Sequence, residues 1–407
     1  MKYVLAPLAG FTDAPFRRMC AEGGADLTYT EMVSAAGLAH GSSPTRHLLE
    51  TMDGEGPVAC QIFGANESDI AYATDFVEKA NHRCSTFNLQ PSTSFKFTEL
   101  NLNAGCPMTK VTREGAGAKL VEDPEKIHRF LKAMVERTSL PVTLKTRLGP
   151  HPRRTNIFEI LDAAESAGAK GIIIHARYTS QMHGGPTHLD ILSDVVRRAK
   201  IPVTGNGSVV DAKSAAAMAA TGVSAIMVGR AALANPCIFS ELKMNEVKVA
   251  EGEDEVKVKG EGEQWNLSTC SAGQPKQEGN ILCSPSPSAF TFSRIDAFRQ
   301  HLSYLLEFRD ILARKFPKDH IPSPDGFASV KMHVHLFRYF NGRPGAAELR
   351  KRLNTVRTLA EIETIVRGFA KDAARLGLSP HHAPARANGE DDTTASSTTN
   401  QPPITNH

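Results

Sequence analysis

Two glycine-containing segments in the middle of the chain have residue types that bind phosphate. Gly205-Asn206-Gly207-Ser208 and Gly229-Arg230 each follow a short apolar run. Glycine lets backbone N–H groups approach an anion closely, and arginine adds charge and a forked set of donors. The segments therefore predict a site for a phosphorylated ligand, although tight turns alone would also explain the glycines.

Lys145 and Gln61 are polar residues within or at the end of β-branched and apolar runs. A lysine at a buried strand end is costly unless an anion accompanies it. The negative edge of a reduced flavin would be one such anion, and a local salt bridge is the alternative. Gln61 offers a donor and an acceptor, which suits the edge of a pyrimidine-like ring.

Cys106 lies in the loop Asn103-Ala104-Gly105-Cys106-Pro107, directly after another apolar run. The flanking Gly and Pro distinguish it from Cys20, Cys60 and Cys237, which we interpret as small core residues. An unperturbed thiol pKa of ~8.5 keeps the group mostly protonated at neutral pH. Cys106 is therefore a candidate general acid as well as a candidate thiolate nucleophile.

Eight short apolar runs must position these side chains, and amphipathic segments follow most of them. The runs are Val4–Leu8, Leu27–Thr30, Val58–Ile62, Leu100–Asn103, Val142–Thr146, Gly171–His175, Val203–Gly205 and Ala225–Val228. Strands that alternate with helices over residues 1–240 predict a (β/α)8 TIM barrel. An open doubly wound sheet is disfavoured because no G-x-G-x-x-G follows the first strand. Barrel sites lie at the C-terminal strand ends, where His175 and Arg177 are also candidate ligand contacts.

Three further regions follow the predicted barrel. Residues 241–293 are acidic and Ser-Pro-rich and predict a disordered insert. Residues 294–376 regain apolar residues at helical spacing, among them Phe298, Leu302 and Val330, and predict a small all-α domain. Residues 377–407 predict a disordered tail.

The formal net charge of +3 over 407 residues conceals an uneven distribution. The balance is +2 over residues 1–240, −4 over 241–293, +7 over 294–376 and −2 after that. The all-α domain thus carries the excess, including Arg314-Lys315, Arg338 and Arg350-Lys351-Arg352. Such runs indicate either a solvated helix face or a contact with a phosphate backbone.

Composition also argues against several classes of protein. The seven cysteines are scattered and contain no C-x-x-C pair, so neither a disulfide scaffold nor a metal site is expected. No signal peptide is recognisable at the start, which together with the cysteines predicts a reducing, cytoplasmic location. The most apolar window, 215–234, contains Gly222, Gly229 and Arg230, so no membrane helix is expected.

Taken in order, these motifs resemble those of the tRNA-dihydrouridine synthase family, in particular its bacterial-type branch. The matching segments are Ala6-Pro7-Leu8-Ala9-Gly10-Phe11-Thr12-Asp13, Gln61-Ile62-Phe63-Gly64, Asn103–Pro107, Lys145-Thr146-Arg147-Leu148-Gly149, His175-Ala176-Arg177, Gly205–Gly207, Val228–Arg230 and Pro344–Arg350. They span about residues 1–240 and 294–370, which leaves only the insert and the tail outside the resemblance.

The resemblance implies an FMN in the barrel mouth, NADPH or NADH as reductant, and a uridine flipped out of tRNA. Cys106 would protonate C5 of the uracil while hydride reaches C6. Asn103 and Arg177 would touch the target base. The remaining roles concern FMN. The residues lining it would be Pro7, Leu8 and Ala9, and those contacting its ring or ribityl chain would be Gln61, Lys145 and His175. Its phosphate would be surrounded by Asn206, Gly207, Ser208, Gly229 and Arg230. A monomer is expected.

The sequence departs from the family pattern at two places. Ser208 stands where the family usually has Gly or Asp, and the segment Asn81–Thr98 is longer than usual. Two other functions stay open at this point. One is a flavin barrel that reduces a small enone or dihydropyrimidine, and the other is an RNA-binding relative without catalytic activity.

Overall fold

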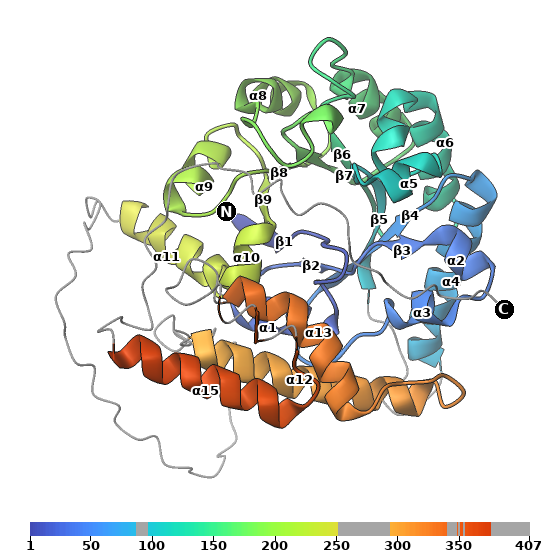
Figure 1. Ribbon diagram of the computed structural model, residues 1–407. Helices are drawn as coiled ribbons and strands as arrows, with labels where there is room; N and C mark the ends of the chain where they lie inside the picture. Colours follow the sequence, from blue (N-terminus) through green and yellow to red (C-terminus); the bar gives the residue numbers. More distant parts are fainter. Residues whose placement is uncertain (87–96, 251–293, 340–347, 349–350, 353–354, 376–407) are drawn as a thin grey trace, which may run out of the picture.

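A parallel β-barrel forms the centre of the computed structural model, which describes residues 1–86, 97–250, 294–339, 348, 351–352 and 355–375 (Figure 1). Within these ranges the strand order is β1-β9-β8-β7-β6-β5-β4-β2, and β3 also pairs with β4. The strands are β1 Lys2–Leu5, β2 Thr28–Tyr29, β3 Val33–Ser34, β4 Val58–Phe63, β5 Phe97–Ala104, β6 Val142–Arg147, β7 Gly171–His175, β8 Val203–Asn206 and β9 Ala225–Val228.

The barrel closes between β1 and the residue that precedes β2. Val4 forms a parallel bridge with Leu27, and the Leu5 N–H donates to the Leu27 carbonyl at 2.9 Å. The predicted TIM barrel is confirmed, and all eight predicted runs contain strand. The additional two-residue strand β3 lies between two of them.

Helices surround the barrel, as the alternating pattern predicts (Figure 1). Local sequence sets several of their starts; for example, Asp13 accepts the Phe16 N–H at 3.2 Å to cap α1. The helices of the barrel are α1 Ala14–Glu22, α2 Ala35–Ala39, α3 Ser43–His47, α4 Glu67–Thr86, α5 Thr109–Arg113, α6 Pro124–Val135, α7 Ile157–Ser166, α8 Leu189–Arg198, α9 Ala212–Ala219, α10 Arg230–Ala234 and α11 Ile238–Ala250.

Apolar side chains fill two layers of the barrel. A small inner cluster lies on the strands, with Val4, Tyr29, Ile173 and Met227 among its members. The larger cluster lies between the strands and the surrounding helices, as expected for parallel strands buried on both faces. The inner cluster includes Ala6, directly after β1, so it reaches the end of the barrel where the candidate residues lie.

A helical region packs on one side of the barrel, over α1 (Figure 1). It contains α12 Arg294–Lys315, α13 Pro324–Tyr339 and α15 Leu359–Arg375. A shared apolar cluster joins Ala14 and Met19 of α1 to Phe298 and Leu305 of α12. Val330, one of the apolar residues at helical spacing, is 69% exposed.

Helix α11 crosses the predicted domain boundary at residue 240. It continues to Ala250, so the first ten residues of the predicted disordered insert are helical. The rest of that insert, the predicted tail and Arg350 lie outside the described residues. In the part of the chain that is described, no helix combines the length and apolarity that crossing a membrane requires.

Candidate active site

A cavity of about 450 Å³ opens at the C-terminal ends of the barrel strands. This volume lies within the range of small-molecule sites. The cavity brings together nearly every site residue predicted from the sequence. Those that line it are Pro7, Leu8, Ala9, Asn103, Cys106, Lys145, His175, Arg177, Asn206, Gly207, Ser208, Gly229 and Arg230.

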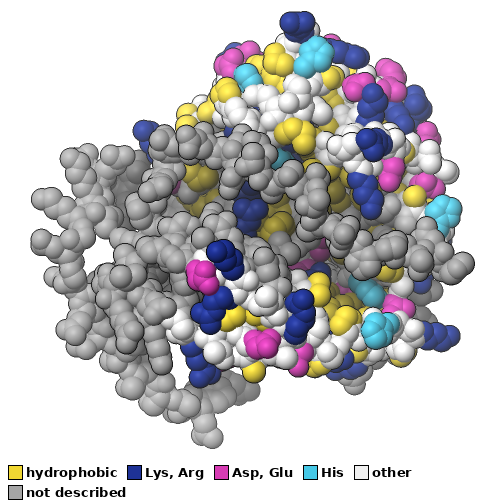
Figure 2. All heavy atoms as spheres, viewed as in Figure 1, with side chains coloured by type: hydrophobic (Ala, Val, Ile, Leu, Met, Phe, Trp, Pro, Cys, Tyr) yellow, Lys and Arg dark blue, Asp and Glu magenta, His cyan; other side chains and the backbone are white. Residues whose placement is uncertain are grey.

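Positive charge dominates the cavity wall. Lys145, Arg147, Arg177, Arg230 and Arg338 line it, whereas no Asp or Glu does so among the described residues. In Figure 2, Lys and Arg side chains lie beside hydrophobic ones near the centre of this face. Because like charges on one wall repel one another, a wall of this kind favours an anionic ligand.

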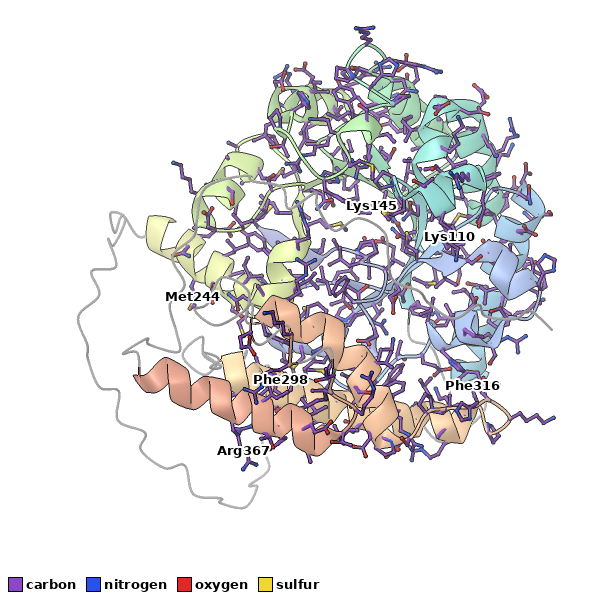
Figure 3. The ribbon with its side chains drawn as sticks, in the orientation of Figure 1. Lys110, Lys145, Met244, Phe298, Phe316 and Arg367 are labelled. Atoms are coloured by element: carbon purple, nitrogen blue, oxygen red, sulfur yellow. The ribbon has the colours of Figure 1, made fainter. Side chains whose placement is uncertain are left out.

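Lys145 reaches into the barrel mouth from β6 (Figure 3). Its ammonium donates to Asn206 Oδ1 at 3.2 Å, and Asn206 in turn donates to the Met227 carbonyl at 2.8 Å. Burial, reinforced by the charge of Arg147, lowers the pKa of Lys145 to about 7. No acid among the described residues pairs with Lys145, so the local salt bridge considered as the alternative is not found there. The charge of Lys145 is thus available for a bound anion.

The Cys106 loop is held by one amide side chain. Asn103 Oδ1 accepts the backbone N–H groups of Gly105 at 3.1 Å and of Cys106 at 3.0 Å. Its Nδ2 donates to Gln61 Oε1 at 2.8 Å. Asn103 thus positions the Cys106 loop, and the predicted contact of Asn103 with a target base stays a prediction, because its amide nitrogen carries a second N–H.

Gln61 lies behind this wall and not on it. Its side chain is fully buried, and its Nε2 donates to Asn101 Oδ1 at 2.7 Å. In this structure Gln61 supports Asn103, and the ligand contact predicted for Gln61 stays a prediction. The network continues from Asn101 to Thr143 at 2.7 Å, so the amide layer is satisfied internally.

Arg147 clamps the opposite side of the Cys106 loop. Its guanidinium donates to the carbonyls of Gly105 at 2.7 Å, Tyr178 at 3.1 Å and Met182 at 2.7 Å. Arg147 is 1% exposed and makes no ion pair among the described residues. The sequence placed Arg147 at a strand end but assigned it no role, although its position two residues after Lys145 on β6 was a signal that it shares the barrel mouth.

The surroundings of the Cys106 thiol favour its protonated form. Burial raises its pKa above the usual range, and the Met108 backbone N–H and the nearby charges of Arg147 and Lys145 only partly oppose this. Cys106 is half-buried and lines the cavity. Of the two alternatives for Cys106, this environment favours the general acid over the thiolate nucleophile.

His175 and Arg177 form a connected pair at the end of β7. Arg177 Nη1 lies 3.2 Å from His175 Nε2, so the ring nitrogen accepts this bond and His175 is neutral. Burial first, and then the surrounding cations, lower the pKa of His175 well below its usual range. Arg177 also donates to the Gly185 carbonyl at 2.7 Å and to Ser208 Oγ at 2.6 Å.

Backbone conformation explains the residues that follow β8. Gly207 has φ +129°, and a Cβ there would come within 2.9 Å of Thr187 Cγ2 and 3.1 Å of His175 Cδ2. Ser208 has φ +56°, a left-handed conformation that Gly and Asp adopt more readily. Ser208 thus occupies a position suited to the family's usual residues, and its hydroxyl holds Arg177.

The helical region contributes to the cavity through Arg338, a residue that the sequence marked only as part of a basic run. Arg338 lies on α13 and places its guanidinium 5.8 Å from the Phe11 ring centre. It lines the cavity together with residues of the barrel. No local pattern could have predicted this, because the contact depends on how α13 packs on the barrel.

Residues 4–265 match the model of a family described as dihydrouridine synthase (Dus). This chain belongs to the dihydrouridine synthase family. The tRNA-dihydrouridine synthase B of Klebsiella pneumoniae is 34% identical over 243 residues, which cover 60% of this chain and 71% of that protein. Its counterpart in Escherichia coli K12 is 33% identical over the same shares. A probable tRNA-dihydrouridine synthase of Treponema pallidum is 33% identical, covering 58% of this chain and 69% of that relative.

The family assignment confirms the resemblance predicted from the ordered motifs, including its bacterial-type branch. It also confirms that the chain is an enzyme of this family and disfavours an unrelated barrel enzyme. The individual roles of the cavity residues stay predictions, because the family match covers the whole domain and does not distinguish among them.

Proposed function

We propose that this chain is a tRNA-dihydrouridine synthase, a monomer that reduces the C5–C6 double bond of uridines in tRNA. The proposed cofactor is FMN, which NADPH or NADH reduces. The observation that carries this proposal is a half-buried cysteine at the wall of a cationic barrel cavity, in a chain of the dihydrouridine synthase family.

The donor set fits a flavin mononucleotide. Lys145 and Arg230 supply positive charge for anionic groups, and Gly207 and Gly229 leave room for backbone N–H groups to approach a phosphate. The Lys145 ammonium has only the neutral Asn206 oxygen as a partner in the described chain. Bound flavin would supply the hydride for C6 of the uracil.

Within this proposal, Cys106 delivers the proton. Reduction at C6 places negative charge on C5 and the adjacent carbonyl, so a positioned acid is needed to complete the product. The thiol proton passes to C5, and the thiolate then regains a proton from solvent. Asn103 and Arg147 hold the loop that carries the thiol, and the nearby cations stabilise the transient thiolate.

The tRNA would bind across the cavity mouth and the helical region. Only a flipped base can enter a barrel cavity, so the uridine must leave the stack. Arg314, Arg338 and Arg352 are exposed in the helical region, whereas Lys315 is already paired with Glu50 of the barrel. We therefore assign phosphate contacts to the exposed arginines and not to Lys315, and we expect binding to weaken steeply with salt.

A direct test is the formation of dihydrouridine in tRNA that lacks the modification. The purified protein should carry or take up FMN and form dihydrouridine with NADPH, as measured by mass spectrometry of nucleosides. Cys106→Ala should retain FMN and lose about 10²- to 10⁴-fold in rate. Cys237→Ala, outside the cavity, is the matched control.

Two results would overturn the proposal. The first is a protein that cannot be loaded with FMN. The second is turnover on small enones or dihydropyrimidines with none on tRNA, which would favour the alternative barrel oxidoreductase.

A further inference from the structure

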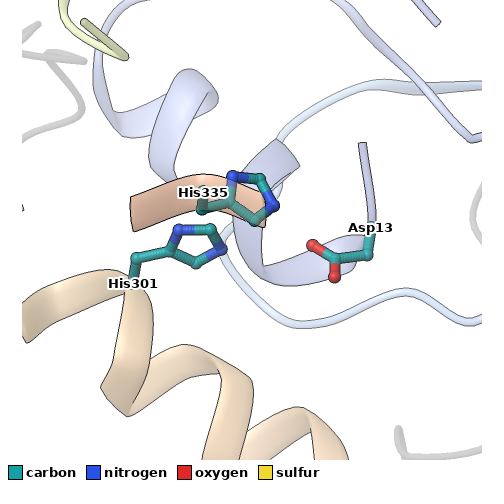
Figure 4. A group of neighbouring side chains, drawn as sticks. All are labelled: Asp13, His301 and His335. Atoms are coloured by element: carbon teal, nitrogen blue, oxygen red, sulfur yellow. The ribbon is translucent and has the colours of Figure 1, made fainter. Parts of the chain in front are cut away.

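A group of buried polar side chains lies where the helical region docks on the barrel (Figure 4). Asp13 precedes α1, His301 lies on α12 and His335 lies on α13. Asp13 is 6% exposed and both histidines are fully buried. One candidate ligand atom from each residue lies within 4.8 Å of the other two.

Four atoms of this group have no hydrogen-bond partner within the described chain. They are Asp13 Oδ2, His301 Nε2 and both ring nitrogens of His335. Buried polar atoms without partners cost free energy, so native proteins seldom retain several of them together. Their concentration at one point indicates a missing shared partner.

In Asp13 and His301, the second polar atom of the side chain is hydrogen-bonded, and this bond orients the atom that has no partner. Asp13 Oδ1 accepts the Phe16 N–H at 3.2 Å, and His301 Nδ1 lies 3.2 Å from the Tyr339 hydroxyl. When Nδ1–H donates to Tyr339, the lone pair of His301 is on Nε2, the atom without a partner. An outer hydrogen bond of this kind is what orients metal-binding histidines.

Charge around the group also favours a cation. The buried Glu31 is a second carboxyl near the group: burial, and then the charge of Asp13, raise the pKa of Glu31, and Lys331 opposes this shift. The ammonium of Lys331 lies 3.7 Å from Asp13 Oδ2, and the Lys331 side chain is 32% exposed. Lys331 can therefore turn towards solvent if another cation takes its place. Burial lowers the pKa of both histidines, to about 4 for His335, which keeps their rings in the neutral form that binds metals.

We propose that Asp13, His301 and His335 bind a divalent transition-metal ion, with Zn²⁺ as the best match. Two imidazole nitrogens and one carboxylate oxygen form a donor set that suits Zn²⁺ and not Mg²⁺ or Ca²⁺. Because the ligands come from the barrel and from two helices of the helical region, the ion would join the two. It would also fix α13, which carries Arg338 to the cavity. This inference does not depend on the proposed function.

The experiment is a titration of the full-length protein with Zn²⁺ as the only ligand, after treatment with a chelator. We expect one Zn²⁺ per chain by calorimetry and by elemental analysis, and a rise in Tm of about 5 °C at a hundredfold excess over Kd. His335→Gln should weaken binding by more than about 100-fold. His151→Gln, which alters an exposed histidine, should leave binding unchanged.

A second variant protects the test against misfolding of the first. Tyr339→Phe keeps the ring volume and should weaken Zn²⁺ binding by about 10- to 100-fold through loss of the bond to His301. The proposal is overturned if folded, chelator-treated protein takes up no Zn²⁺. Equal affinities of Tyr339→Phe, His335→Gln and His151→Gln would also overturn it, because the bound ion would then lie elsewhere.

Discussion

The cavity and the surface under the helical region both bury charged side chains, but the partners of these charges differ. Under the helical region, Glu50 pairs with Lys315, and Arg17 donates to Glu55 Oε2 at 2.7 Å. Around the cavity, Lys145 and Arg147 have only neutral partners among the described residues. The charges of these two pairs are thus neutralised within the chain, whereas those of the two cavity residues are not.

This difference separates charges that stabilise the fold from charges that serve a ligand. Removing one partner of a buried ion pair strongly destabilises the folded protein, since the other charge is left uncompensated. A buried cation without an acid already bears that cost, and an anionic ligand would relieve it. Substitutions in the two regions should therefore have different effects on stability and on binding.

The largest effect is expected at Arg17 on α1. Arg17 and Glu55 are 1% and 2% exposed, so Arg17→Met leaves a buried carboxylate unpaired. The free energy of unfolding should fall by about 3–5 kcal/mol, measured by chemical denaturation. Arg18→Met is the matched control, because Arg18 is more exposed and pairs with Glu22 and Glu307; it should cost at most about 1 kcal/mol. Equal losses of stability in the two variants would show that burial does not raise the cost of removing one partner of an ion pair.

Lys145→Met should show the opposite pattern. It removes a cation that no carboxylate balances, so the unfolding free energy of flavin-free protein should stay within about 1 kcal/mol of wild type. Affinity for FMN should fall by roughly 10- to 100-fold, equivalent to about 1.4–2.8 kcal/mol. Lys110→Met, which alters an exposed lysine on α5 near the same mouth (Figure 3), should change neither quantity. A large loss of stability in Lys145→Met would place Lys145 with the structural charges.

The pKa of Lys145, about 7, gives the comparison a pH dependence. An unfolded lysine titrates near 10.4, so between pH 7 and 10 the unfolded chain binds more protons and the flavin-free protein gains stability as pH rises. An anionic ligand favours the ammonium, so its affinity should fall over the same range, by up to about tenfold per pH unit. Titrations at several pH values test both slopes, and Lys145→Met should lose both. If stability and affinity keep the same dependence on pH in Lys145→Met, a group other than Lys145 binds the proton.

Ser208 should show the smallest effect. Alanine at its φ of +56° keeps the backbone strain and loses the bond to Arg177, whereas glycine loses the bond but relieves the strain. Ser208→Gly should therefore be about 1 kcal/mol more stable than Ser208→Ala. Thermal unfolding of the two variants measures the difference. If the two variants are equally stable, backbone conformation does not explain why the family usually has Gly or Asp at this position.

The sequence predicted the barrel well because its strands are short apolar runs separated by helical periodicity. The same rule placed Cys106, Lys145, His175 and Arg230 at one end of the barrel, since parallel strands bring their C-terminal ends together. Helix α11 was missed beyond residue 240 because its last ten residues were grouped with the acidic segment that follows Ala250.

Roles that depend on packing were not predictable in the same way. Gln61 lies within strand β4, near the same end of the barrel, yet its side chain lies behind Asn103. Asp13, His301 and His335 lie far apart in the sequence and meet only when α12 and α13 dock on α1. The sequence argument against a metal site rested on the absence of C-x-x-C pairs, and it did not take the histidines into account.

The most direct test of the central claim is a single turnover without oxygen. Protein loaded with FMN and reduced by NADPH is mixed with tRNA that lacks dihydrouridine, and flavin absorbance and nucleosides are measured together. We predict that one dihydrouridine forms for each flavin reoxidised, with Cys106→Ala at least about 100-fold slower. Reoxidation by free uracil or a small enone, with tRNA inert, would contradict the assignment.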